Sequence, residues 1–361
     1  MVSYKSSSNF IFCRLDTKKN ITLQGNKDLK DFLLLNAFSC VAPGIAQGKA
    51  GVALTLFMLA RRQRDERLEE QAFDLLQQAL VYSGKNIHFS VGSAGIGFVL
   101  LYLIRYHFID ADFYEIFDEQ HRHILKTICS GQWKLKGMQE YAELLMYLDW
   151  SAGYVPGTDL RQAEEILMKR LQDYYQEIRR KQEGYFNSEE FCRCSSLLLT
   201  IYRDVEAGKE WWEKVEACCC SWQERSVVVD SIELGYKLMR YGRFHAVKDA
   251  EELGYRMLCR TLENKFPEIM SLREQTNLLF FFAQDRELRS MPVACKLKER
   301  IAERLVYAGK KRLEEQIVHS AWHYAFYCGL EGGVARLLLL RSYWDMLESG
   351  GQFPELECIF Y

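Results

Sequence analysis

The chain has 361 residues, of which 48% are hydrophobic and 27% charged, a composition typical of a globular protein with a substantial core. Its 47 lysines and arginines nearly balance its 49 aspartates and glutamates, which argues against the clustered basic excess of a nucleic-acid-binding protein. No apolar run approaches the roughly 20 residues of a membrane span and the first residues lack a signal-peptide pattern, so we expect a cytoplasmic protein without a membrane partner.

The first clear element is a helix entered through a pair of glycines, and this phrase occurs three times. The segments GKAGVALTLFML, GSAGIGFVLLYL and GLEGGVARLLLL align without a gap. Their paired glycines are Gly48 and Gly51, Gly92 and Gly95, and Gly329 and Gly332. Glycines three apart share one face of a first helical turn, where another backbone or a ligand can come close. Tight packing is the simpler interpretation of the two.

The spacing of the copies predicts a repeat. The second copy begins 44 residues after the first, and the third begins 237 residues after the second, which divides into five steps of about 47 residues. Units should therefore begin near residues 48, 92, 139, 187, 234, 281 and 329. The four weaker addresses hold helix-like segments at residues 138–150, 188–203, 231–241 and 273–284.

Each apolar helix is followed by a more polar one, for example at residues 64–83 and 112–130. A linear stack of helical hairpins leaves an apolar helix uncovered at each end, whereas seven hairpins that close into a ring bury every apolar helix. With five prolines in the chain there is no sign of a linker between domains. We predict an all-α fold, an (α/α) toroid with a double ring of seven inner and seven outer helices, as a single domain over 1–361 with a lead-in at 1–40.

The three phrases resemble the repeat signature of the lanthionine synthetase C-like (LanC-like) family over roughly residues 40–345. The resemblance implies a double seven-helix toroid that acts in the maturation of ribosomally synthesised peptides. It also implies one zinc ion, held by two cysteines and a histidine. Zinc turns a peptide cysteine into a thiolate, which adds to a dehydrated serine or threonine and closes a thioether ring.

This sequence departs from the family at the zinc ligands. The family takes them from Trp-Cys-x-Gly and Cys-His-Gly loops, but the chain contains no Trp-Cys, Cys-His or His-Gly pair. Residues 229–233 (VDSIE) and 272–275 (LREQ) occupy the corresponding positions and offer no soft nitrogen or sulfur ligand. We therefore predict no cofactor and a toroid that binds a peptide or a partner maturation enzyme, which leaves open whether any catalysis remains.

Other thiols and imidazoles supply one alternative metal site. His319 and His323 are four residues apart, and with Cys328 they could form a relocated zinc site and support a cyclase with substituted ligands. We expect the remaining cysteines and histidines to have no chemical role. Cys192, Cys194 and residues 218–220 (CCC) are expected to be core thiols, and His121 and His123 are expected to be solvated.

Polar residues at the mouths of the predicted inner helices would converge on one bowl. They are Gln47, Glu189, Asp230, Glu233, Arg273, Glu274, Gln275 and Glu331. Carboxylates among them could act as acid and base in a carbohydrate-active hydrolase, which is a third hypothesis. Acidic residues at helix N-termini also cap the first turn and complement the helix dipole, which is the simpler explanation.

Overall fold

The computed structural model is built of helices, and the residues that it describes are 26–81, 86–131, 133, 135, 137–154, 158–180, 188–202, 206–224, 231–264, 267–308, 328–351, 356 and 359. No strand occurs among these residues, so the all-α prediction is confirmed for them. Over the same ranges, no helix has both the length and the apolar character needed to cross a bilayer.

Apolar helices occur at or near the seven predicted positions. They are α2 (Lys49–Gln63), α4 (Ser93–Arg105), α6 (Met138–Ser151), α8 (Ser188–Ile201), α10 (Ile232–His245), α12 (Leu272–Gln284) and α17 (Val334–Glu348). Of these, α12 begins nine residues before 281 (281 − 272) and α17 begins five residues after 329 (334 − 329). Every residue of α4 from Ser93 to Leu103 is buried, which fits a helix that neighbours cover on all sides. The four segments with only weak sequence similarity, at residues 138–150, 188–203, 231–241 and 273–284, therefore all contain helices.

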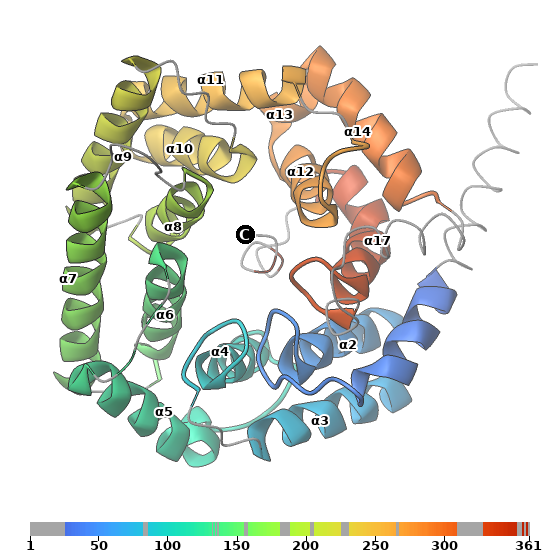
Figure 1. Ribbon diagram of the computed structural model, residues 1–361. Helices are drawn as coiled ribbons and strands as arrows, with labels where there is room; N and C mark the ends of the chain where they lie inside the picture. Colours follow the sequence, from blue (N-terminus) through green and yellow to red (C-terminus); the bar gives the residue numbers. More distant parts are fainter. Residues whose placement is uncertain are drawn as a thin grey trace, which may run out of the picture.

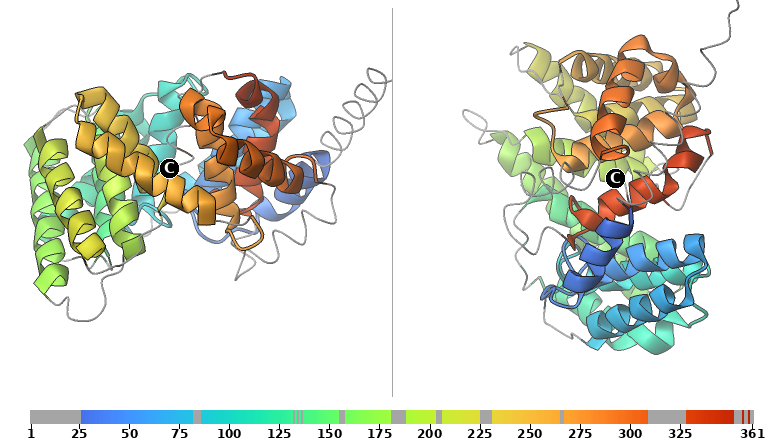
Figure 2. Two further views of the ribbon diagram at one scale, coloured as in Figure 1. Left: turned by 90° about the horizontal axis from the view of Figure 1, so that it is seen from above. Right: turned by 90° about the vertical axis from the view of Figure 1, so that its right-hand side faces the viewer.

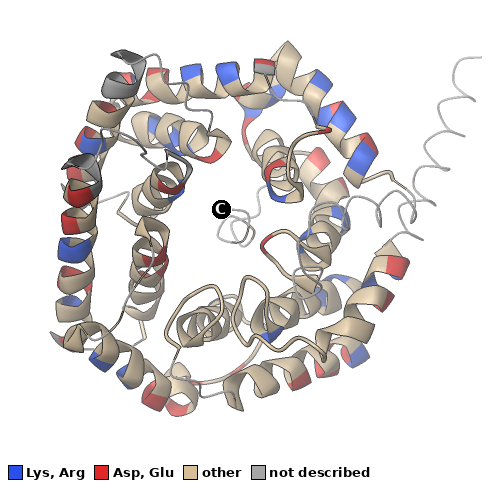
Figure 3. Ribbon diagram, viewed as in Figure 1, with Lys and Arg blue, Asp and Glu red and all other residues tan. Residues whose placement is uncertain are grey.

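The helices between them are amphipathic and lie outside the apolar ones in Figure 1. They are α3 (Glu66–Val81), α5 (Phe113–Ser130), α7 (Thr158–Arg180), α9 (Glu206–Glu224), α11 (Lys248–Asn264), the short α13 (Arg286–Ser290) and α14 (Pro292–Leu305). Most of the charged residues lie on this outer layer (Figure 3), while the inner helices are mainly uncharged. Each outer helix thus turns one apolar stripe inward and keeps its charges in water.

The apolar helices contact one another in chain order. Contacts run from α2 through α4, α6, α8, α10 and α12 to α17, and α17 in turn contacts α2. Figure 1 shows these helices around a common centre, and Figure 2 shows the same layers from two sides. The first and last repeats are therefore neighbours, so neither leaves an apolar face without a partner.

The residues expected to be only a lead-in include a helix, at residues 26–37. It lies beside α17, where Arg341 Nε donates a hydrogen bond of 2.6 Å to Asn26 Oδ1. It also approaches the end of α2, since Lys30 Nζ lies 3.7 Å from a carboxylate oxygen of Asp65. Figures 1 and 2 show this helix (dark blue) outside α17 (red). The outer position beside the last apolar helix is therefore filled from the N-terminal side of the chain.

The first two glycine phrases begin their helices as predicted. Gly48 and Gly92 are the N-cap residues of α2 and α4, and Gly51 and Gly95 lie in the first turn. A Cβ atom at Gly51 would stand 1.9 Å from the carbonyl oxygen of Ile45, and one at Gly95 would stand equally close to a carbonyl of its own preceding loop. Close backbone approach, the simpler of the two interpretations, explains these glycines.

The third phrase begins its helix later than its alignment predicts. The N-cap of α17 is Gly333, so Gly329 and Gly332 precede the helix instead of lying on its first turn. Gly329 still serves close approach, because a Cβ there would lie 2.5 Å from the Ala46 carbonyl oxygen. Gly332 would meet nothing within 4 Å. The third phrase matches the first two in sequence, but its first four residues, 329–332, belong to the loop before the helix.

The expectation that His121 is solvated is wrong. His121 is 1% exposed, and its Nδ1 lies 2.6 Å from the hydroxyl oxygen of Tyr147. It follows Phe113 and Phe117 at four-residue spacing, so it continues the buried stripe of α5. Burial lowers the pKa of His121 to about 4, and the ring is therefore neutral near pH 7. His123, on another face of the helix, is exposed as expected.

The cysteines of α8 and α9 are core thiols. Cys192, Cys194 and Cys218 are buried, and Cys219 is half-buried. Burial raises the pKa of Cys192 and of Cys194 well above the ordinary value, so both remain protonated. This confirms the packing interpretation for these residues, while the side chain of Cys220 lies outside the described residues.

Candidate functional site

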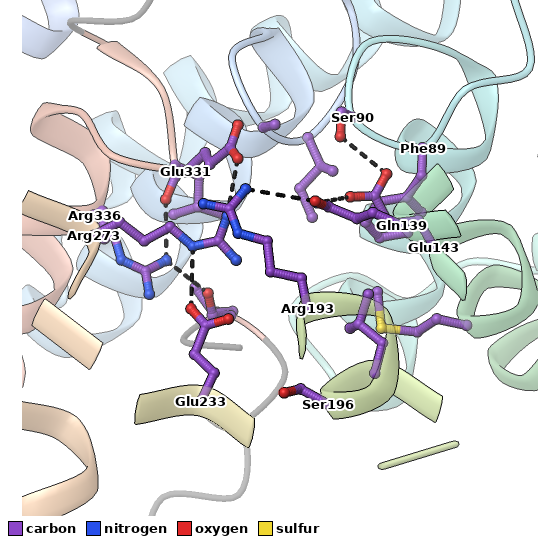
Figure 4. A pocket seen from close by; sticks show the side chains of 16 residues that line it. Phe89, Ser90, Gln139, Glu143, Arg193, Ser196, Glu233, Arg273, Glu331 and Arg336 are labelled. Atoms are coloured by element: carbon purple, nitrogen blue, oxygen red, sulfur yellow. Dashed lines mark hydrogen bonds and ion pairs between the residues drawn. The ribbon is translucent and has the colours of Figure 1, made fainter. Parts of the chain in front are cut away.

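A pocket collects side chains from every repeat. It has a volume of about 810 Å³, measured out to the open solvent at its mouth, and Figure 4 shows the side chains around it. Helices α6, α8, α10, α12 and α17 line it together with the loops before α2, α4 and α17. Its polar residues are Ser90, Gln139, Glu143, Arg193, Ser196, Glu233, Arg273, Glu331 and Arg336. All seven units therefore meet at one site.

Main-chain hydrogen bonds join the loops that form one wall of the pocket. The Glu331 N–H donates to the Ala46 carbonyl oxygen at 3.0 Å, and the Ala46 N–H donates to the Ser90 carbonyl oxygen at 2.9 Å. The loops before α17, α2 and α4 are thus connected in series. The glycines beside them let these backbones approach, so the repeated phrase positions the loops and their side chains.

Glu143, one turn into α6, is a buried carboxyl group in this pocket. The Ser90 hydroxyl donates to its Oε2 at 3.1 Å, and Gln139 Nε2 donates to its Oε1 at 2.6 Å. Burial raises the pKa of Glu143 to about 7; nearby Glu331 adds to the rise, while the two hydrogen bonds and Arg273 oppose it. The group can therefore gain or lose a proton near neutral pH.

An ion-pair network occupies the opposite side. Arg273 NH1 donates to Glu331 Oε1 at 3.0 Å, and Arg273 Nε lies 3.4 Å from Glu233 Oε1. Asn277 Nδ2 also donates to Glu233 Oε1, at 2.6 Å. Arg273 and Glu233 are 15% and 16% exposed, so water screens this pair only partly. The network holds the ends of α10, α12 and the α17 loop together at the pocket.

Arg336 is a fully enclosed cation of α17, 2% exposed. Its Nε donates to Thr276 Oγ1 at 2.7 Å and its NH2 donates to Asn277 Oδ1, while its NH1 donates to the carbonyl oxygens of Leu330 and Ile359 at 3.3 and 2.9 Å. Burial lowers the pKa of Arg336 to about 9. Its guanidinium is therefore oriented by α12 and presents donors to main-chain carbonyls.

Arg193 approaches from α8. Figure 4 shows its side chain reaching into the pocket, and its NH1 donates to Gln139 Oε1 over a long 3.5 Å. Gln139 is also the residue that donates to Glu143. A chain of polar contacts therefore runs from α8 through α6 to the loop that carries Ser90.

The predicted bowl residues fall into three groups: those that line the pocket, those that do not, and those outside the described residues. Three of them line the pocket as expected: Glu233, Arg273 and Glu331. Gln47 stands in the loop before α2, half-buried, and does not line it. The side chain of Glu189 and the whole of Asp230 lie outside the described residues.

Glu274 and Gln275 serve the structure of α12. Glu274 forms a capping box with Ser271, in which each side chain accepts from the other residue's main-chain N–H, at 2.9 and 3.2 Å. Gln275 is 1% exposed, and its Nε2 donates to the Met270 carbonyl oxygen at 2.9 Å. Neither side chain lines the pocket. For Glu274 the simpler expectation, an acidic residue that caps a helix, is confirmed.

The described residues contain no group of three or more His, Cys, Asp or Glu side chains placed to hold a metal ion. His319 and His323 of the alternative zinc site lie outside those residues. Cys328 is described and buried, but it does not line the pocket. A side-chain hydrogen bond with Cys40, together with burial, raises the pKa of Cys328, so this sulfur is a thiol packed against a second thiol.

Sequence reasoning missed Glu143, Arg193 and Arg336. Each is a single charge inside an otherwise apolar stretch, as in Ala142-Glu143-Leu144-Leu145. A charge on the buried face of an apolar helix is costly unless it is paired or faces a polar cavity. A single charge of this kind in α6, α8 and α17 is the signal that could have identified these pocket residues.

Comparison with known proteins adds no relative: no family model matches the chain, and neither does any curated protein sequence. The pocket itself mixes three guanidinium groups, from Arg193, Arg273 and Arg336, with the carboxyl groups of three glutamates. Such a lining offers donors and acceptors together, which suits a ligand that carries both, as a peptide backbone does.

Proposed function

We propose that the chain is a divergent LanC-like protein, with an (α/α) toroid of seven inner and seven outer helices as its single domain. The closed order of contacts from α2 through α17 and back to α2 supports the toroid. The three glycine phrases, two of which begin apolar helices with a glycine N-cap, support the family. The helix at residues 26–37 would be the seventh outer helix.

In this proposal the protein acts in the cytoplasm in the maturation of a ribosomally synthesised peptide, and its pocket binds that peptide or a partner enzyme without zinc. The observation that carries it is the convergence of all seven repeats on one pocket with mixed charge. An extended peptide presents alternating N–H and C=O groups, which the glutamates and arginines of the pocket can accept and donate to.

The residues near the family's zinc addresses support a site without metal. Glu233 and Arg273 stand there, and each is engaged with the other across 3.4 Å. A guanidinium group has no lone pair to offer and stays protonated, so Arg273 cannot replace a cysteine or a histidine as a ligand. A cation at this position also repels a metal ion.

Peptide binding is tested with a random-peptide display library, selected against the protein and read out by fluorescence anisotropy of the recovered peptides. Arg193→Glu reverses a charge inside the pocket, and Lys126→Glu makes the same change on the exposed surface of α5. Selected peptides should lose at least about tenfold in affinity for Arg193→Glu and keep it for Lys126→Glu. Peptides whose affinity neither substitution changes would bind outside the pocket, and this result would contradict the proposal.

Metal analysis separates this function from the zinc-dependent cyclase with substituted ligands. Protein purified without chelators should contain no stoichiometric zinc. About one zinc per chain, lost on His319→Ala or on Cys328→Ala, would establish the cyclase alternative instead. A short precursor peptide encoded next to a maturation enzyme in the genome would further favour peptide modification.

Glu143 favours one second candidate, an acid–base hydrolase of the kind seen among carbohydrate-active α/α toroids. A carboxyl group whose pKa is raised to about 7, close enough to Glu331 to feel its charge, has the character of a general acid. A panel of glycans tests this: hydrolysis that Glu143→Gln abolishes would support the candidate. If no glycan is cleaved by the wild-type chain, the hydrolase is excluded for that panel.

A further inference from the structure

Two cysteines meet where the first and the last repeat join. Cys40 follows the helix at residues 26–37, in the loop that leads into α2, and Cys328 stands just before the loop that leads into α17. Both are free thiols, 6% and 2% exposed, and a side-chain hydrogen bond joins them. They are 288 residues apart in the chain (328 − 40), so only the closure of the fold brings them together.

The main chain beside the two thiols fixes this approach independently of the sulfurs. The Glu331 N–H donates to the Ala46 carbonyl oxygen at 3.0 Å, and a Cβ at Gly329 would stand 2.5 Å from the same oxygen. On the other side, the Cys40 N–H donates to the Ala37 carbonyl oxygen at 3.2 Å. The two segments are therefore in backbone contact next to the thiols, and each thiol is held close to its partner.

The surroundings of the pair decide which sulfur reacts first. The hydrogen bond from Cys328 lowers the pKa of Cys40; burial opposes this fall, and the ammonium group of Lys49 adds to it. The same hydrogen bond, together with burial, raises the pKa of Cys328. Cys40 is therefore the thiol that attacks an oxidant more readily, and Cys328 lies beside it as a resolving thiol.

We propose that Cys40 and Cys328 are a modification site, where hydrogen peroxide converts the two thiols into a disulfide that closes the ring covalently. The Cys40 thiolate attacks one peroxide oxygen and the O–O bond breaks, which gives a sulfenic acid and hydroxide. The Cys328 sulfur then attacks the Cys40 sulfur, forms the S–S bond and displaces the hydroxyl group. Both sulfurs are oxidised, and the peroxide is reduced to two water molecules that take up the two thiol protons.

Burial accounts for the choice of oxidant. Hydrogen peroxide is small enough to reach thiols that are almost fully enclosed, whereas a disulfide such as oxidised glutathione needs an open approach to the sulfur. The closing movement is short, because hydrogen-bonded sulfurs have only to approach from contact to a bond length of about 2.05 Å.

The disulfide would act on the seam of the ring and on the pocket. Cys40 precedes Ala46, and Cys328 precedes Glu331, two residues that line the pocket. A bond between the cysteines therefore ties two wall loops to each other. It also restricts the unfolded chain, because it closes a loop of 288 residues (328 − 40). This effect goes beyond the proposed function and holds whether or not the pocket binds a peptide.

Peptide mapping tests the site on the full chain. The protein is reduced with dithiothreitol, freed of the reductant, treated with hydrogen peroxide, blocked with N-ethylmaleimide and digested without reduction for mass spectrometry. We expect the peptides that carry Cys40 and Cys328 to be joined, and dithiothreitol to separate them. The oxidised chain should melt at least about 5 °C higher than the reduced chain, because its unfolded state is restricted.

Serine variants supply the controls. Cys40→Ser and Cys328→Ser should each abolish the cross-link and the rise in melting temperature, whereas Cys295→Ser removes an exposed thiol and should preserve both. Mapping of the wild-type chain needs no variant, so a serine variant that circular dichroism shows to be unfolded does not decide the test. Cys40 and Cys328 that remain thiols while Cys295 is oxidised would overturn the inference. Cys40 joined to a different cysteine, or oxidised to a sulfinic acid, would overturn it as well.

Discussion

Glu143→Gln should abolish the loss of folding stability that the wild type shows as the pH rises through the neutral range. The carboxyl group is buried in the folded chain with its pKa raised from 4.5 to about 7, whereas in the unfolded chain it returns to its ordinary value. Between these two values the unfolded state ionises first, so the folded state loses stability as the pH rises. The glutamine variant cannot ionise and should not show this loss.

The magnitude follows from the shift. About 2.5 pH units at 1.36 kcal/mol per unit give about 3 kcal/mol, which is present in full below pH 4.5 and lost by the time the pH exceeds 7. Glutamine fits the site, because its amide oxygen can accept from Gln139 Nε2 while its NH₂ group donates to the Ser90 hydroxyl. Relative to the wild type, the free energy of unfolding of Glu143→Gln should therefore rise by about 3 kcal/mol between pH 4.5 and pH 8.

Urea unfolding followed by circular dichroism, at half-unit steps over this pH range, measures the difference. Glu70→Gln, on the solvent side of α3, is the matched control for the loss of one carboxylate. The reasoning is refuted if the difference between Glu143→Gln and wild type stays as flat as that of the control. A shift of the same size in the opposite direction would mean that the pocket stabilises the ionised form.

Three further measurements address the repeat and the core. Gly51→Ala should lower the free energy of unfolding in urea by several kcal/mol, because the new Cβ would stand 1.9 Å from the Ile45 carbonyl oxygen. Gly332→Ala should be nearly neutral, since a Cβ there meets nothing within 4 Å. Equal costs would contradict the role given to the paired glycines. Ser271→Ala should lower the free energy of unfolding by about 1 kcal/mol through loss of the capping box, as thermal melts can determine. His121, with its pKa lowered to about 4, should make wild type lose about 3 kcal/mol as the pH falls from 6.5 to 4, and His121→Phe should not share that loss in acid titrations.

Much of the fold was predictable because the inner helices are covered on all sides. Burial on every face leaves a long apolar run in α4 and a run of four leucines in α17. Shorter apolar stretches, such as residues 144–148 of α6, remain where the glycine phrase is lost. The helix at residues 26–37 could not be predicted as part of the outer layer. Its position depends on contacts with Arg341 and Asp65, which are distant in the sequence.

The candidate site was predictable only at the helix mouths. Glu233, Arg273 and Glu331 stand at or just before a helix start, where the repeat places them at one end of the molecule. Glu143 lies inside α6, and Arg336 lies in the first turn of α17, a helix that begins later than its glycine phrase predicts. Only the rotation of each helix decides whether such a side chain meets the pocket or a neighbour. That rotation depends on packing between repeats, which a single repeat does not encode.

The contact between the last and the first repeat also has a kinetic consequence. The Tyr343 hydroxyl donates to the Met58 carbonyl oxygen at 3.4 Å across 285 residues of chain, whereas most other contacts join neighbouring hairpins. Closing so long a loop costs more entropy than pairing two successive helices, and contacts of high sequence separation slow folding. We expect hairpins to form early and the seam between α17 and α2 to close last, so that the pocket is completed only in the final step of folding.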